Sequence, residues 1–210
     1  MKIAVTGKGG VGKTTIAAVL ARLYAEEGQR VIAADADPDA NLGLALGFPE
    51  KLLDEIVPIT TLRKLIEERT GANEENAILR RIINNLVLHR KDVAILDMEA
   101  GLEHFGRATT QGVDQFIVVI EPGSRSIQTY RNVKRLAKDL GVAKVGVIAN
   151  KVRNAEDERF ILDNIPGEEF LGFVHYNTEV VDADRNSVSP YDFSRTVTEE
   201  IRKITERIEG

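Results

Sequence analysis

Nine consecutive residues near the start of the sequence combine the residue types that bind phosphate. Residues 7–15 read G-K-G-G-V-G-K-T-T and fit the phosphate-binding loop G-x-x-x-x-G-K-[ST]. The glycines let backbone N–H groups point at a phosphate, and Lys13 and the Thr14 hydroxyl can meet phosphate oxygens and Mg²⁺. The sequence therefore predicts a site for a nucleotide and Mg²⁺. Its predicted phosphate-binding residues are Gly9, Gly10, Val11, Gly12, Lys13, Thr14 and Thr15.

A second motif, N-K-V-R at residues 150–153, concerns the base of the nucleotide. In the related pattern N-K-x-D, the carboxylate accepts hydrogen bonds from guanine, but Arg153 cannot accept one. Asn150 can both donate to adenine and accept from it, so we interpret Asn150 and Lys151 as base-binding residues and favour ATP over GTP. The alternative is an ordinary strand-to-loop turn, in which Asn is common.

Carboxylates after two apolar runs supply candidate metal ligands. Residues 93–97 read V-A-I-L-D, and an aspartate at this place in a phosphate-loop protein can hold Mg²⁺ through water. Asp97 is therefore a predicted metal residue together with Thr14. A second group, D-A-D-P-D-A-N-L at residues 35–42, should lie at the ligand-binding edge of a sheet; the alternative is an acidic turn.

The order of apolar runs predicts the elements that position these residues. Apolar strands alternate with amphipathic helical segments, which is typical of a parallel sheet covered on both faces. We therefore expect a three-layer α/β fold of the P-loop NTPase kind, mostly parallel, in a single domain over residues 1–210, with the nucleotide at the carboxyl edge. The expected strands are residues 2–6, 30–34, 93–97, 115–120, 142–149 and 170–174.

The helical segments are marked with unequal clarity. One begins near Thr14 and ends at Gly28, and another covers residues 126–140. Residues 44–88 read as mainly helical with weak boundaries, and their best segment is 74–88. The last helix has a polar face of mixed charge, whereas a membrane-bound helix needs a predominantly basic one. We expect this helix to pack on the core through Val197, Ile201, Ile204 and Ile208.

The composition excludes several classes of function. The chain has no cysteine, which rules out disulfides, thiolate zinc sites and cysteine-bound iron–sulfur clusters. A net charge of −5 with both signs interspersed gives no sign of a nucleic-acid partner. No apolar run approaches the roughly 20 residues that span a bilayer, and the amino terminus lacks the features of a secretory signal. We therefore expect a cytoplasmic protein with no membrane partner.

Lys8 makes the phosphate loop K-G-G-x-G-K-T-T, which resembles the deviant Walker A loop of the MinD, ParA, nitrogenase iron-protein and ArsA ATPases. The resemblance implies that two nucleotide-bound subunits face each other and that Lys8 reaches the partner's phosphates; the alternative is a solvated loop cation. It also makes residues 35–42 the first switch segment, in which Asp37 orients the attacking water, with Asp35 and Asn41 in support. The predicted catalytic residues are Lys8, Lys13 and Asp37, and the predicted metal residues are Thr14, Asp37 and Asp97.

Residues 97–107 read D-M-E-A-G-L-E-H-F-G-R and, with 113–126, closely resemble the CooC-type ATPases that mature nickel carbon monoxide dehydrogenase. The resemblance spans essentially the whole chain. Members of that family carry a Cys-x-Cys pair that binds metal across the dimer, but residues 71–76 read G-A-N-E-E-N at the matching place. Without thiolates the soft metal site cannot form, which counts against nickel binding by this chain. We interpret His104 as a structural or switch residue rather than a metal ligand.

Together these motifs predict an ATP-dependent homodimer that hydrolyses MgATP slowly to ADP. The leading hypothesis is an accessory factor for a client nickel enzyme such as carbon monoxide dehydrogenase. One alternative is a ParA- or MinD-type positioning ATPase that acts on DNA or membrane. Another is a CooC-like paralogue that kept the ATP switch and lost metal handling.

Overall fold

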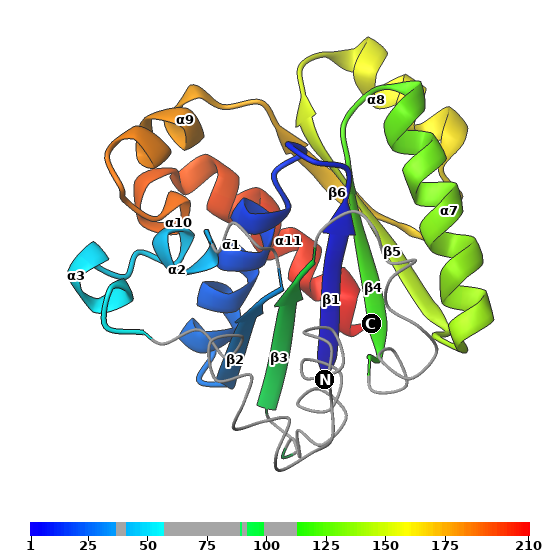
Figure 1. The fold of residues 1–210 in the computed structure, drawn as a ribbon. Coiled ribbons are helices and arrows are strands. Elements are labelled where there is room, and N and C mark those ends of the chain that lie inside the picture. Colours follow the sequence, from blue (N-terminus) through cyan, green and yellow to red (C-terminus); the bar gives the residue numbers. More distant parts are fainter. Residues whose placement is uncertain (37–40, 57–88, 90–91, 99–112) are drawn as a thin grey trace.

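A parallel sheet organises the computed structural model, which describes residues 1–36, 41–56, 89, 92–98 and 113–210. In this part of the chain the sheet has six strands in the order β2-β3-β1-β4-β5-β6 (Figure 1). Every pairing between neighbours is parallel. The strands are β1 (Lys2–Gly7), β2 (Arg30–Asp35), β3 (Asp92–Asp97), β4 (Gln115–Ile120), β5 (Lys144–Val152) and β6 (Phe170–His175).

Helices cover both faces of this sheet, as predicted. On one face lie α1 (Lys13–Glu26) and α11 (Arg195–Glu209), and on the other lie α7 (Ser124–Leu140) and α8 (Ala155–Asn164) (Figure 1). The remaining helices among the described residues are short and gather beside α1. They are α2 (Leu42–Ala45), α3 (Glu50–Leu53), α9 (Thr178–Arg185) and α10 (Pro190–Phe193).

Two apolar clusters, one on each face of the sheet, form the core. Successive residues of β4 alternate between them: Ile117 and Val119 pack with α1 and α11, whereas Phe116 and Val118 pack with α7 and α8. The apolar residues predicted for the last helix, Val197, Ile201, Ile204 and Ile208, are all buried in the first cluster. This confirms that α11 packs on the core.

The structure differs from the expected elements in a few places. The fifth strand continues through Asn150 to Val152 because a register shift against β6 lets it extend beyond the predicted end at residue 149. The helix expected at residues 126–140 begins two residues earlier, at Ser124. Of the helical region 44–88, α2 and α3 lie in the described part, and the segment 74–88 lies outside it. That residues 1–210 form one domain stays a prediction.

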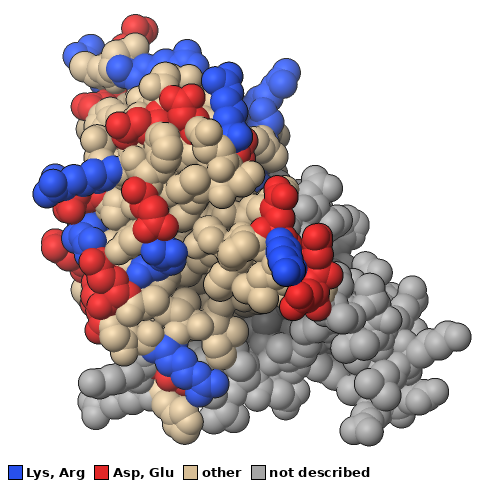
Figure 2. All heavy atoms as spheres, turned by 90° about the vertical axis from the view of Figure 1, so that its left-hand side faces the viewer, with Lys and Arg blue, Asp and Glu red and all other residues tan. Residues whose placement is uncertain are grey.

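Among the described residues on the face that carries the short helices, neither positive nor negative side chains dominate. Seen from the left-hand side of Figure 1, acidic and basic side chains are interspersed around a broad uncharged area (Figure 2). In the described part of the chain, no helix is both long and apolar enough to cross a membrane.

Candidate nucleotide site

The phosphate loop lies between β1 and α1, where the backbone requires glycine at two positions. Gly10 has φ 79° and Gly12 has φ 92°, both in the left-handed region that glycine adopts at low cost. Gly12 precedes the first turn of α1 and has no side chain to cap it, so the N–H groups of that turn remain for an anion. The loop therefore has the geometry that a phosphate group needs.

Two residues at the end of β5 hold the loop in place. The Asn150 side-chain amide donates a hydrogen bond to the Val11 carbonyl at 2.7 Å, and the Lys151 ammonium donates to the Gly10 carbonyl at 2.5 Å. Asn150 is 8% exposed, and Lys151 has φ 58°, which is unusual for a residue with a side chain. Both residues are predicted to bind the base, and the structure shows that they also contact the phosphate loop.

Gly12 is needed for a further, steric reason. A Cβ atom at this position would lie 2.4 Å from Asn150 Nδ2, closer than non-bonded atoms tolerate. The absence of a side chain at Gly12 is therefore what lets Asn150 reach the loop. The sequence pattern gives the glycine but not this partner, because the two residues are far apart in the chain.

Three of the predicted phosphate and metal residues, Lys13, Thr14 and Asp97, lie at the carboxyl edge of the sheet. Lys13 is buried at the start of α1 with only 6% of its surface exposed, and the neighbouring Thr14 is half-buried. Asp97 is fully buried at the end of β3, in register with Val5 of β1 and Asp35 of β2. A threonine hydroxyl and a carboxylate are oxygen ligands of the kind that Mg²⁺ prefers, so the residues present suit this ion.

Asp35, predicted to support the first switch segment, makes a specific contact with the last residue of that segment. Its Oδ2 accepts a hydrogen bond at 2.9 Å from the backbone N–H of Leu42, the first residue of α2. The next residue of the chain, Ala36, donates its N–H to the Asp97 carbonyl at 2.9 Å. The two ends of the first switch segment are therefore fixed against β2 and β3.

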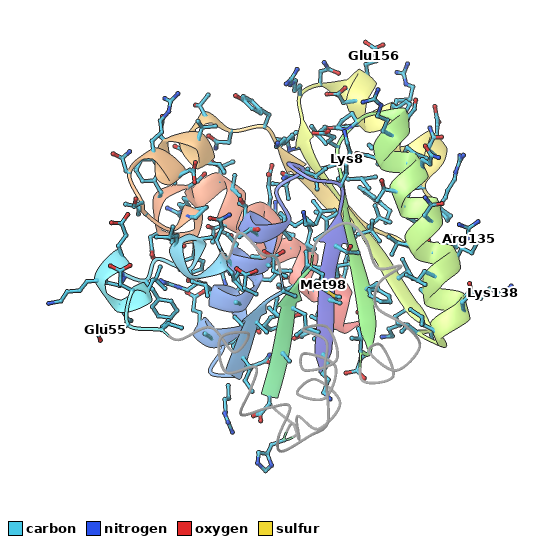
Figure 3. All side chains as sticks on the ribbon, in the orientation of Figure 1. Lys8, Glu55, Met98, Arg135, Lys138 and Glu156 are labelled. Atoms are coloured by element: carbon cyan, nitrogen blue, oxygen red, sulfur yellow. The ribbon has the colours of Figure 1, made fainter. Side chains whose placement is uncertain are left out.

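Several predicted residues fall outside the described part of the chain. Asp37 lies in residues 37–40, and His104 and the CooC-like stretch after Met98 lie in residues 99–112. The segment 71–76 that replaces the Cys-x-Cys pair also lies outside it. Lys8 is described: it is half-buried on the loop at the carboxyl edge, while Arg135 and Lys138 project from α7 away from the sheet (Figure 3).

A hollow of about 70 Å³ adjoins the phosphate loop and is the candidate base site. Its walls come from the start of α1, the ends of β5 and β6, α9 and α11, and they combine apolar side chains with amides. They are lined by Gly12, Thr15, Asn150, Lys151, Val174, His175, Tyr176, Asn177, Val180, Val181 and Val197. A larger cavity of about 670 Å³ lies at the opposite edge of the sheet, around Gln115 and Lys144, far from the loop. The smaller hollow is the candidate base site because it lies next to the phosphate loop, although it is not the larger of the two.

Part of this wall carries no sequence signal. Val180 and Val181 carry no motif, and Val197 was read only as a core residue. Helical spacing signals which residues of an element are buried, but it does not tell which of them meet a ligand from another element.

Comparison with known proteins fits this geometry. The family described as the CobQ/CobB/MinD/ParA nucleotide binding domain matches residues 2–190. The chain belongs to this family. One relative is the carbon monoxide dehydrogenase accessory protein CooC of Rhodospirillum rubrum, 40% identical over an alignment that covers 92% of this chain and 90% of that protein. An uncharacterized ATP-binding protein of Methanocaldococcus jannaschii is also 40% identical, with 97% and 96% covered.

Solved structures share the fold. MinD of Pyrococcus horikoshii in complex with Mg-ADP has a TM-score of 0.74 at 22% identity, covering 100% of this chain and 96% of that one. A putative plasmid partition protein of Borrelia burgdorferi bound to AMPPNP has a TM-score of 0.77 at 16% identity, covering 99% and 98%. These findings confirm the predicted family, the three-layer α/β fold and the class of P-loop ATPase.

This family member is short. The alignment with the M. jannaschii relative is 252 positions long, whereas the chain has 210 residues, so at least 42 positions have no counterpart here.

Proposed function

We propose that this chain is a CooC-like accessory ATPase, which binds and slowly hydrolyses MgATP and dimerises in the ATP state to serve a nickel enzyme such as carbon monoxide dehydrogenase. The observation that carries this proposal is 40% identity with CooC along 92% of the chain. The preformed phosphate loop and the hollow beside it support the ATP-binding part.

The chain's own residues suggest how phosphoryl transfer would proceed. The backbone N–H groups of the loop and the first turn of α1, together with Lys13, would hold the phosphates. Thr14 and Asp97 would hold Mg²⁺, which neutralises phosphate charge when bound. Asp37 would orient the attacking water, and Lys8 of the partner subunit would approach the same phosphates across a dimer. Hydrolysis would then depend on dimerisation.

The absence of cysteine shapes the role proposed for nickel. Thiolates are the soft ligands of the family's metal pair, and this chain has none. Among the described residues, no group of three or more His, Asp or Glu side chains is arranged to hold a metal ion. We infer that the chain acts on its client through an ATP-dependent change of assembly rather than by carrying nickel itself.

The positioning alternative receives less support. A MinD-type membrane helix would present an apolar face, but the apolar face of α11 is buried against the sheet. Figure 2 shows mixed charge rather than a basic surface on the face in view. We therefore expect neither DNA nor membrane to be the partner.

Light scattering with ATP and Mg²⁺, under conditions that block hydrolysis, tests the proposal together with ATPase rates. We expect the parent to dimerise, and Lys8→Ala to lose roughly 10³-fold or more in rate while still binding ATP. Lys138→Ala is the matched control, because this exposed lysine projects away from the site and should leave the rate unchanged. A parental rate in Lys8→Ala, or a parent that stays monomeric with ATP, contradicts the shared-site mechanism.

A further inference from the structure

His175 ends β6 at the rim of the base hollow and lies between two carboxylates. Its Nδ1 is 2.7 Å from Glu200 Oε1, and its Nε2 is 3.1 Å from Glu158 Oε1. The backbone N–H of His175 also donates to Glu200 Oε2 at 2.9 Å. The residue therefore contacts α11 through Glu200 and α8 through Glu158.

This arrangement suits only one protonation state of the ring. A neutral imidazole has one N–H donor and one acceptor nitrogen, so one of the two carboxylates would face a lone pair. The imidazolium has two donors and satisfies both carboxylates with charge-assisted hydrogen bonds.

Two of these elements, β6 and α11, form walls of the base hollow, and α8 comes soon after the lining residues at the end of β5. Glu200 lies about one helical turn beyond Val197, which lines the hollow, and Glu158 is on the helix that follows Asn150 and Lys151. The segment after His175 is attached to the same wall, because the Tyr176 N–H donates to the Val152 carbonyl at 2.8 Å. The ring is therefore where β6, α8 and α11 meet.

We propose that His175 is a positioning residue for the base end of the nucleotide site. Its imidazolium holds α8 and α11 to the end of β6, and this keeps Tyr176, Asn177 and Val197 at their places around the base. Loss of the ring proton removes one of the two bonds, so the walls separate more easily and the affinity for ATP falls. This inference rests on the ATP binding proposed above.

The charged groups around the ring set the direction of the pH effect. Hydrogen bonds to Glu200 and then to Glu158 raise the pKa of His175 above its ordinary value of 6.5. Arg153 is directed to the Tyr176 ring, 5.4 Å from its centroid, and Glu179 of α9 accepts a hydrogen bond from Ser194. Within β6, the uncharged Phe173 ring lies with its centroid 6.2 Å from that of the His175 ring. Affinity should therefore be highest at low pH and decrease as pH rises above 6.5.

ATP affinity between pH 6 and pH 9, measured for the parent and for His175→Gln, tests the proposal. Because the terminal phosphate of ATP also titrates near this range, the readout is the ratio of the two affinities at each pH. We expect the parent to bind about two- to five-fold more tightly than His175→Gln at pH 6, with the ratio approaching one at pH 9. His89→Gln is the control, since His89 is exposed before β3, at the opposite edge of the sheet. A constant ratio, or an equal change in His89→Gln, overturns the proposal.

NMR titration of the histidines gives a second measurement that needs no nucleotide. The chain has three histidines, so the resonance missing in His175→Gln assigns the one of interest. Its pKa should lie above 6.5 in the parent and fall in Glu158→Gln, which removes one carboxylate and leaves the Glu200 contacts. An unchanged pKa in Glu158→Gln overturns the bridging role. If the parent binds no ATP at any pH, the proposed function fails and this inference with it. If the parent binds ATP but the ratio of its affinity to that of His175→Gln does not change with pH, only this inference fails.

Discussion

The two ends of the nucleotide site are built in different ways. The phosphate end is one continuous stretch, residues 7–15, with a buried Lys13 and a backbone fixed by glycine conformations and by Asn150. The base end is assembled from five elements, and Tyr176 on its rim is 48% exposed. Groups that stabilise developing charge need fixed geometry, whereas a base needs mainly a fitting surface. Changes at the phosphate end should therefore affect chemistry, and changes at the base end should affect affinity.

Apart from Lys8→Ala, the largest effect is expected for Lys13→Ala. Removing the buried cation proposed to contact the phosphates should lower the rate of ATP hydrolysis by roughly 10²- to 10³-fold or more, by analogy with the loss of one preorganised donor. Steady-state ATPase assays measure this rate, and a thermal melt checks that the fold is retained. If the rate decreases less than it does for any base-end variant, the division between the two ends is wrong.

Gly12→Ala should disturb the phosphate end through the backbone. The substitution places a Cβ atom in a left-handed conformation and against Asn150 Nδ2, so it should destabilise the fold by about 1–2 kcal/mol and weaken ATP binding at least about tenfold. Urea unfolding and ATP titration measure the two effects. Gly123→Ala is the matched control, because no atom lies within 4 Å of its added Cβ. An equal loss of stability in both variants would show that the Asn150 contact is unimportant.

Asn150→Asp sharpens the comparison, because Asn150 bonds to the phosphate loop and also lines the candidate base hollow. The isosteric change places a carboxylate oxygen opposite the Val11 carbonyl instead of a donor, which should cost about 1–3 kcal/mol of stability. Hydrolysis and affinity should both decrease, unlike in a variant of the base end alone. If the affinity for ATP decreases but the hydrolysis rate at saturating ATP does not change, Asn150 acts only in binding the base.

Val180→Ala should give a small effect confined to affinity. This half-buried residue lines the hollow, and its truncation should weaken ATP and ADP binding alike by about two- to five-fold. The rate at saturating ATP should stay at the parental value. Isothermal titration with ATP and with ADP checks that the two affinities decrease equally. A change in the hydrolysis rate at saturating ATP would contradict the separation of chemistry at the phosphate end from affinity at the base end.

The smallest effect concerns stability and pH. Because the pKa of His175 is raised, its contribution to stability is complete below pH 6.5 and disappears as the pH rises through the folded-state value. The ring is partly exposed, so the loss should be below about 1 kcal/mol. Urea unfolding of the parent and His175→Gln at pH 6 and pH 9 measures the difference. If the stability advantage of the parent over His175→Gln is larger at pH 9 than at pH 6, the result contradicts this prediction.

The contrast between the two ends also explains which features of the site can be predicted from the sequence and which cannot. The phosphate loop, the apolar strands and the last helix depend on local patterns, so their positions follow from residue types at fixed spacing. Asn150 was recognised from its motif, but its bond to Val11 depends on the sheet order, in which β4 lies between β5 and β1. The base wall depends wholly on tertiary packing, and no local signal marks Val180 or Val181. Asp37 lies outside the described residues, and its role stays a prediction.

The hydrogen bonds from Asn150 and Lys151 to the phosphate loop have a thermodynamic consequence. They order the loop during folding, so its conformational entropy is already lost before a nucleotide arrives. A ligand that contacts only this loop, such as pyrophosphate, should therefore bind with little ordering of the protein and a small change in heat capacity.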